Sequence, residues 1–339
     1  MKKIFIAIVA LAAATACSNS EIVSLNQEAI AFDNAFVNNS VRSVNDPSYS
    51  NTNMFADFQV YGYVENAPLF NADNTGVTVS KNITNDELNS DWKYEGTQYW
   101  IAGAKYNFAA VAPMTNGGWE KTAADATSTT LSFTNNGETD LLYAYAAQEG
   151  KVSGNETVAF TFRHVLSKVK FSFENGYNAT NATIRVKNIQ ITDAYASGEV
   201  VLAANTTWTN QDGTLVLNFG NAALTEADNA ALTTENDKGL VLKLNDTVES
   251  YNELFLIPSA SRDYTVTFTV ELLVSGQEVA QYTHTATATF APQPGNAYDI
   301  KTVITATNID PEHKQEPIEF TVNTLPDWGT TTDVNVPQN

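Results

Sequence analysis

The sequence predicts an all-β protein built from two β-sandwich domains in tandem. Apolar and polar residues alternate along most of the chain, and turn residues separate the alternating runs. The chain shows no regular strand–helix alternation, which favours sandwiches over α/β units. About 320 residues follow the predicted signal segment, more than one hydrophobic core usually organises. The expected domains are residues 43–158 and 159–339, with a polar, glycine-containing run at 149–156 near their boundary.

Residues 1–16 have the composition of a secretory signal peptide. Lys2 and Lys3 precede an apolar run at 4–14 that is too short to span a bilayer comfortably, and small residues follow it. Cys17 comes next and is the single cysteine of the sequence, so it has no partner for an internal disulfide. The run that ends in this cysteine resembles a bacterial lipobox, in which the sulfur receives a lipid. The alternative is a plain signal peptide with an incidental cysteine near its end.

Charge and composition restrict the function classes. The 18 basic and 38 acidic residues give a net charge of −20. Such a chain is repelled by nucleic acid phosphates and by anionic headgroups, so we exclude nucleic acid as a partner. The 17 Phe, 14 Tyr and 5 Trp supply enough apolar surface for two cores. No segment after the signal peptide is apolar enough to cross a membrane as a helix.

Strand-like runs cover both halves of the chain. They lie at 54–64, 100–113, 130–146, 158–173, 213–219, 239–244, 254–258 and 298–304. The alternation at 264–274 and 280–290, on either side of a Ser-Gly-Gln turn, predicts one long hairpin. Two weak helix candidates occur at 84–88 and 225–232.

One strand-like run changes its rhythm partway along. Phe162 and Leu166 share one parity, whereas Phe171 and Phe173 have the other. Because side chains alternate with a period of two, this change indicates a bulge, or a strand that leaves one core and enters another. His164 lies on the apolar face of this run, so we expect a buried structural histidine rather than a catalytic one.

The same run, at 160–173, resembles the F-x-H-x-L-x-K-V signature strand of the fimbrillin (Mfa-like) proteins of anaerobic gut and oral Gram-negative bacteria. Companion segments follow the family's order at 29–43, 106–113, 140–144, 254–260, 294–304 and 325–329. The resemblance implies transthyretin-like sandwiches and export as a lipoprotein, held in outer-membrane lipid through an acylated Cys17. It also implies assembly with other pilus subunits into a type V fimbria that contributes to adhesion to host or bacterial surface ligands.

The opening segment predicts a removable first strand, with Ile30, Phe32 and Phe36 on one face. Release of such a strand would leave an apolar groove with unpaired backbone groups, which a strand from another chain can fill. The C-terminal tail is a candidate replacement, because Val334 and Val336 alternate onto one face. It offers less apolar area than the first strand.

A processing site is predicted just beyond the first strand. Arg42 is the first basic residue after Lys3 and lies in a polar run suited to proteolysis. Together with the family resemblance, this position predicts cleavage between Arg42 and Ser43. An incidental arginine in a linker is the alternative.

We expect no catalytic residues, no cofactor and no metal site. His164, His284 and His313 are far apart in the sequence and have no cysteine partner. None of the common catalytic motifs occurs. Thr247 follows Asp246 and precedes an aliphatic residue, a pattern that resembles the O-glycosylation acceptor of these bacteria. A solvent-facing turn explains the same pattern almost equally well.

Two functions of different classes remain open at this point. The first is a structural subunit of a fimbria. The second is a surface lipoprotein that never polymerises and binds glycans through exposed aromatics such as Trp92, Trp100 or Trp119. Burial in a β-sandwich core explains these tryptophans at least as well.

Overall fold

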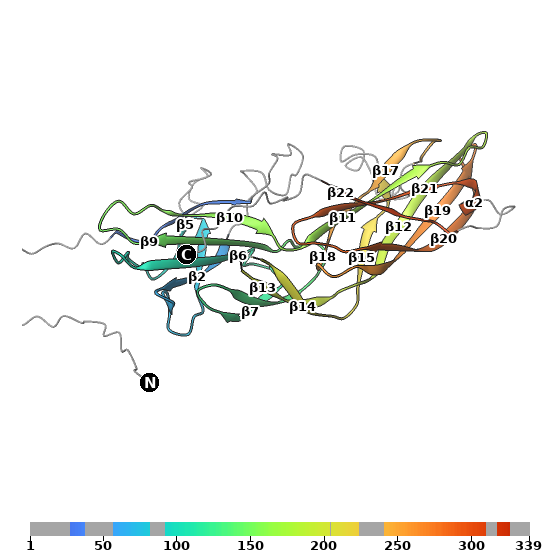
Figure 1. The fold of residues 1–339 in the computed structure, drawn as a ribbon. Helices are drawn as coiled ribbons and strands as arrows, with labels where there is room; N and C mark the ends of the chain where they lie inside the picture. Colours follow the sequence, from blue (N-terminus) through green and yellow to red (C-terminus); the bar gives the residue numbers. More distant parts are fainter. Residues whose placement is uncertain are drawn as a thin grey trace, which may run out of the picture.

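The computed structural model of the protein describes residues 28–37, 57–81, 92–203, 205–223, 241–309 and 317–325, apart from the side chains of 33–37, 81 and 223. Strands make up nearly all of the regular structure, and the described part holds one short helix, α2 (Ala306–Ile309). The predicted all-β class is therefore confirmed. Figure 1 shows an elongated molecule, with most strands of the two chain halves at opposite ends. None of the helical residues described forms a segment long and apolar enough to cross a bilayer.

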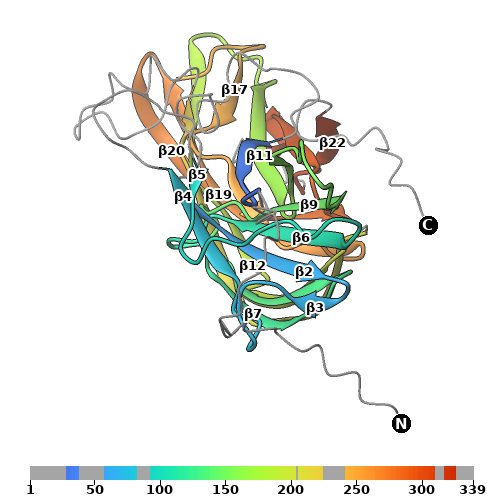
Figure 2. The same cartoon turned by 90° about the vertical axis from the view of Figure 1, so that its left-hand side faces the viewer.

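The first sheet has the order β1-β10-β9-β6-β2-β4-β5, with β3 paired to β2. Figure 2 shows β9, β6 and β2 side by side in it. β1 runs parallel to β10, whereas the pairs inside the sheet run antiparallel. The strand bounds are β1 (Phe32–Val37), β2 (Asp57–Val64), β3 (Ala67–Pro68), β4 (Val77–Lys81), β5 (Trp92–Lys93), β6 (Lys105–Ala112), β9 (Leu142–Glu149) and β10 (Val158–His164).

A second sheet lies against the first and has the order β14-β13-β8-β7. Its strands are β7 (Trp119–Ala124), β8 (Thr129–Thr134), β13 (Ser197–Leu202) and β14 (Thr207–Asp212). Figure 1 shows β7, β13 and β14 together below β2 and β6. The β13–β14 hairpin comes from the later half of the chain, yet Val200 pairs with Leu131 of β8. The domain boundary between residues 158 and 159 stays a prediction.

The central strand β6 separates two hydrophobic clusters. Phe108 points to one cluster, which also contains Ile30 and Phe32 and which we call the slot core. Val111, three positions later and therefore of opposite parity, points to the other cluster, which lies between the two sheets and contains Leu131. Successive side chains of a strand point to opposite faces, so a strand covered on both sides must be apolar at nearly every position. This explains the continuous apolar run over 108–112.

The second half of the chain forms a sandwich of two further sheets. Their orders are β16-β17-β11-β21-β22, with β18 on β11, and β15-β12-β19-β20. The bounds are β11 (Ser167–Asn175), β12 (Ala182–Ala194), β15 (Leu215–Gly220), β16 (Ala222–Ala223), β17 (Thr247–Ser250), β18 (Leu254–Leu256), β19 (Arg262–Val274), β20 (Gln277–Phe290), β21 (Ala297–Ile304) and β22 (Thr321–Leu325).

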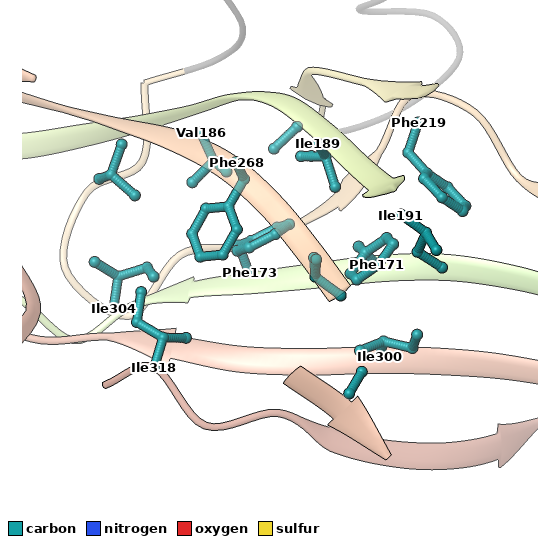
Figure 3. Packing of buried hydrophobic residues seen from close by; sticks show 14 of the residues in the cluster. Phe171, Phe173, Val186, Ile189, Ile191, Phe219, Phe268, Ile300, Ile304 and Ile318 are labelled. Carbon is teal, nitrogen blue, oxygen red and sulfur yellow. The ribbon is translucent and has the colours of Figure 1, made fainter. Parts of the chain in front are cut away.

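The C-terminal core lies between these two sheets and is rich in aromatic and β-branched side chains (Figure 3). Phe173 of β11 packs against Phe268 of β19 with ring centroids 5.1 Å apart, and Phe171 packs against Phe219 of β15 at 4.8 Å. Each of these four phenylalanines is at most 1% exposed. Each contact joins one sheet to the other, so the core holds the sandwich together.

The predicted long hairpin is confirmed as β19 and β20. Tyr264 pairs with Ala288, and Val274 pairs with Gln277. The turn residues Ser275 and Gly276 have φ values of 52° and 78°. A two-residue turn with both φ values positive matches the twist of the flanking strands, and glycine adopts it without strain.

The change of rhythm between Phe162 and Phe171 marks a passage between sheets. β10 ends at His164 in the first sheet, and β11 begins at Ser167 in the C-terminal sandwich. His164 is 5% exposed, and its Nδ1 lies 2.5 Å from Oδ2 of the buried Asp140. The interpretation of His164 as a buried structural histidine is confirmed.

One predicted strand is wrong in the described part of its range. Within 241–244, strand pairing is limited to a single bridge between Leu242 and Ile184. The chain then turns, because the carboxylate of Asp246 accepts a hydrogen bond from the Lys243 N–H at 2.8 Å and Asn245 has a φ of 67°. The two helix candidates, at 84–88 and 225–232, lie outside the described residues.

Candidate functional site

The N-terminal strand, residues 28–37, fills a slot at the edge of the first sheet. On one side β1 pairs with β10, and the Val158 N–H donates to the Ala31 carbonyl at 2.8 Å. On the other side the Ile30 N–H donates to the Gln98 carbonyl at 2.8 Å, and the Trp100 N–H donates to the Glu28 carbonyl at 3.0 Å. In Figure 1 the blue ribbon of β1 lies beside β10 and β5. We call this space between β10 and residues 94–100 the strand slot.

Two side chains of the N-terminal strand are buried in the strand slot. Ile30 is 2% exposed and Phe32 is 3% exposed. The Phe32 ring stacks on Phe160 with centroids 5.7 Å apart and meets the edge of Phe108 at 5.6 Å. Burial of two such side chains contributes about 3–6 kcal/mol before the cost of ordering the strand. Ala29 and the next alanine are exposed, as the alternation predicts.

Tyr94 closes the strand slot from the side of β5. Its ring lies 5.2 Å from that of Phe32, and its hydroxyl donates to the Ile30 carbonyl at 2.8 Å. The same oxygen accepts a hydrogen bond from the Gln98 N–H at 3.2 Å. Burial raises the pKa of Tyr94, and the hydroxyl therefore stays protonated and able to donate at neutral pH. One side chain thus binds both the backbone and a ring of the N-terminal strand.

Glu28 fixes the start of the strand at the rim of the slot. Its carboxylate accepts hydrogen bonds from the Asn155 N–H at 2.6 Å, the Gly154 N–H at 2.7 Å and the Asn155 side-chain amide at 2.8 Å. These bonds, together with the positive charge of Lys151, hold the pKa of Glu28 below its ordinary value. The carboxylate is therefore ionised at neutral pH while it holds the strand.

The pairing of β1 with β10 shifts register within the strand, and the side chain of Phe36, expected on the face of Ile30 and Phe32, lies outside the described residues. Phe32 lies opposite Val158, but a shift after Asp33 places Phe36 opposite Thr161. Such a shift is a bulge, in which one extra residue changes the parity of the rest of the strand. The strand slot therefore depends on the first part of the strand, residues 28–32.

This arrangement can hold a strand. The slot offers backbone groups on both sides and buried pockets for alternate side chains, which is how sheet edges bind strands. Sequence reasoning identified the strand but missed Glu28, Tyr94 and the loop at 151–155. A lone glutamate, a tyrosine and a short polar loop that ends in Gly154 and Asn155 carry no periodic signal, because their contact depends on the tertiary fold.

Several predicted site residues lie outside the described residues, namely Cys17, Arg42, Ser43 and His313. Thr247 is described as the exposed first residue of β17, directly after a turn. Its glycosylation stays a prediction. Among the residues that the structure covers, no cluster of His, Cys, Asp and Glu could hold a metal ion.

The tryptophans offered for glycan binding serve the interior instead. Trp92 is 8% exposed and Trp100 is 4% exposed, and both belong to the slot core. Trp119 is partly buried against the cluster between the first two sheets, and its indole N–H donates to the Pro113 carbonyl at 2.8 Å. The interpretation of these residues as core positions is confirmed.

The chain is similar to several solved structures, and the first of them, with a TM-score above 0.5, shows a shared fold. A fimbrial protein from Bacteroides vulgatus matches 87% of this chain and 98% of its own length with a TM-score of 0.58 and 16% identity. A protein from Bacteroides uniformis that is proposed to act in cell adhesion matches 88% of this chain and 98% of its own length. Its TM-score is 0.48 and its sequence identity is 16%. The fimbrial anchor protein Mfa2 from Porphyromonas gingivalis matches 89% of this chain and 98% of its own length. Its TM-score is 0.37 and its sequence identity is 13%.

Comparison by sequence gives the family. No curated protein matches the chain. The family profile described as fimbrillin-like matches residues 47–327, which is most of the sequence. The chain therefore belongs to the fimbrillin-like family.

Proposed function

We propose that the protein is a structural subunit of a cell-surface fimbria that polymerises by exchange of strands between subunits and contributes to adhesion. Membership of the fimbrillin-like family supports the fimbrial role and the location at the cell surface. The single observation that carries the exchange mechanism is the strand slot. A separate N-terminal strand fills it with two buried side chains and with hydrogen bonds on both sides.

The proposed pathway begins with export as a lipoprotein through Cys17 and attachment to the outer membrane. Cleavage after Arg42 then makes residues 28–37 a separate peptide. A tethered strand wins over any free competitor because its effective concentration is in the millimolar range for a short linker. Cleavage removes this advantage, so that a strand with less apolar area can replace it.

The replacement strand is proposed to come from the C-terminal tail of a neighbouring subunit. β22 is already paired with β21, from Lys301 opposite Thr321 to Ala297 opposite Leu325. The donor would therefore begin after Leu325, where Val334 and Val336 share one parity. In this proposal the exchanging residues follow β22 in the sequence, so the exchange would leave the β21–β22 pairing intact.

The proposed function is tested by treating the full-length protein with an arginine-specific protease and following its size. Wild type should lose its N-terminal segment and form a ladder of oligomers. Arg42→Ala should stay monomeric, and a chain that stops after Asp327 should be cut without polymerising. Efficient polymerisation of both variants would contradict the proposal, and so would a cut wild type that stays monomeric.

A further inference from the structure

The loop that holds Glu28 is closed by contacts within the loop itself and with the chain just before β6. Its own contacts close it: the Lys151 N–H donates to Asn155 Oδ1 at 2.6 Å, and the Asn155 amide donates to the Lys151 carbonyl at 3.0 Å. Gly154 has a φ of 70°, a conformation that lets two successive N–H groups point the same way. Gly150, at the start of the loop, donates its N–H to the Ala104 carbonyl at 2.9 Å. These contacts do not involve the N-terminal strand.

The ligand observed in this loop is the carboxylate of Glu28, at a fixed distance along the strand from the buried side chains. Glu28 stands two residues before Ile30 and four before Phe32. The carboxylate meets two backbone N–H groups and one amide, all within 2.8 Å. Hydrogen bonds to an ionised acceptor are stronger and more directional than bonds between neutral groups. The loop can therefore distinguish strands by the charge of this residue and by its position relative to the buried side chains.

We propose that the 151–155 loop is a carboxylate receptor that selects which strand occupies the slot. In the closed subunit it binds Glu28. In a polymer it favours an incoming strand that carries an acidic residue two positions before the first pocketed apolar residue, whereas a strand without that acid can still fill the pockets but binds less tightly. This inference rests on the proposed function, since strand exchange is what brings a second strand to the slot.

The partner that fits best is a strand from a different fimbrial subunit. In this chain's own tail, Val334 and Val336 are the alternating apolar pair. The residue two positions before this pair is Thr332, and the residue two positions after it is Gln338. Neither is acidic, whichever way the strand runs. An acid-bearing strand from another subunit is thus favoured over a second copy of this tail.

Binding of two labelled peptides tests the proposal. One has the sequence of residues 28–37, and the other carries Gln in place of Glu28. The protein is the full chain with a sequence-specific protease site built in near residue 42, cut at that site and separated from its N-terminal segment, so that the slot is open and the test does not depend on natural processing. Fluorescence anisotropy measures both affinities. We expect the Glu peptide to bind about three- to tenfold more tightly, the range for one hydrogen bond near the surface.

Asn155→Asp identifies the loop as the source of that preference. Asp keeps the shape and the acceptor for the Lys151 N–H but places a negative charge against the incoming carboxylate. In this variant the preference for the Glu peptide should vanish or reverse. Glu65→Gln is the matched control, because Glu65 also accepts a backbone N–H, that of Lys105 at 2.7 Å, away from the strand slot. It should leave the preference unchanged.

Each outcome decides the question. Equal binding of the two peptides to wild type overturns the carboxylate receptor but leaves strand exchange intact. A preference that persists in a folded Asn155→Asp chain overturns the role of the loop. If neither peptide binds, both this inference and the exchange mechanism are wrong. The comparison of peptides on wild type needs no altered loop, so it stands even if the variant misfolds.

Discussion

The slot core and the C-terminal core are both rich in phenylalanine, but they are completed in different ways. The C-terminal core draws its buried residues from Val169 to Ile318, within one stretch of chain. The slot core takes Ile30 and Phe32 from the N-terminal strand and its other members from Phe58 onward. One core is therefore closed by its own sheets, whereas the other is closed by a strand that a single cut can separate. The proposed strand exchange requires a subunit that opens at one end and stays folded at the other, and this difference between the cores would allow it.

The largest effect separating the two cores should come from truncating one ring in each. Phe32→Ala should destabilise the N-terminal strand by about 3 kcal/mol, because it deletes a buried ring. That loss corresponds to roughly a hundredfold faster hydrogen exchange of the Val158 amide, which donates to Ala31, under conditions where the exchange rate follows the opening equilibrium. Phe173→Ala, a control with equal chemistry, should lower the unfolding free energy of the C-terminal sandwich by about 3–5 kcal/mol. It should leave the Val158 amide unchanged, and faster exchange there would contradict separate cores.

A smaller effect is expected from the hydroxyl that holds the strand backbone. Tyr94→Phe removes the donor to the Ile30 carbonyl and should weaken the strand by about 1 kcal/mol. Tyr145→Phe removes a hydroxyl bonded to Asn107 in the interior of the same sheet, at 2.6 Å, and serves as the control. Hydrogen exchange of residues 28–37 should quicken in the first variant alone. Equal effects in both would show that the slot is no more separable than the sheet around it.

The smallest effect should be the pH dependence of the strand. Hydrogen bonds from Asn155 and Gly154 lower the pKa of Glu28 from 4.5. The ionised carboxylate therefore stabilises the bound N-terminal strand in full above pH 4.5. This stabilisation is lost as the pH falls through the lower pKa of the folded state, because the protonated acid holds the loop less strongly. Strand opening, corrected for intrinsic exchange, should thus differ between wild type and Glu28→Gln at pH 7. The difference should shrink as the pH falls below 4.5, and a difference that grows toward low pH would contradict this sign.

The sequence was sufficient where a residue's environment depends on its own strand. The hairpin of β19 and β20 followed from alternation and a Ser-Gly turn, and the passage from β10 to β11 followed from the changed parity after Leu166. Prediction failed where a local contact competed with the pattern. Asn245 and Asp246 turn the described part of the apolar run, residues 241–244, away from strand pairing.

The candidate site was predictable only in part for a related reason. The alternation of Ile30 and Phe32 predicted a strand with one apolar face, and both side chains are buried in the structure. The partners of that strand come from distant positions: Asn155 lies 127 residues from Glu28, and Tyr94 lies 64 residues from Ile30. Pairing of the β13–β14 hairpin with β8 depends on the tertiary fold in the same way. No periodicity within one segment reports which distant segment will lie beside it.

Hydrogen exchange before and after a cut between Arg42 and Ser43 tests most directly whether one core is separable and the other is not. The Val158 and Trp100 amides report the strand slot, because they donate to Ala31 and Glu28. The Asn175 amide, which donates to the Asp246 carbonyl at 3.0 Å, reports the C-terminal sandwich. We predict that the cut lowers protection at the first two amides and leaves the third unchanged. Unchanged protection at all three amides, or an equal loss at all three, would contradict the account.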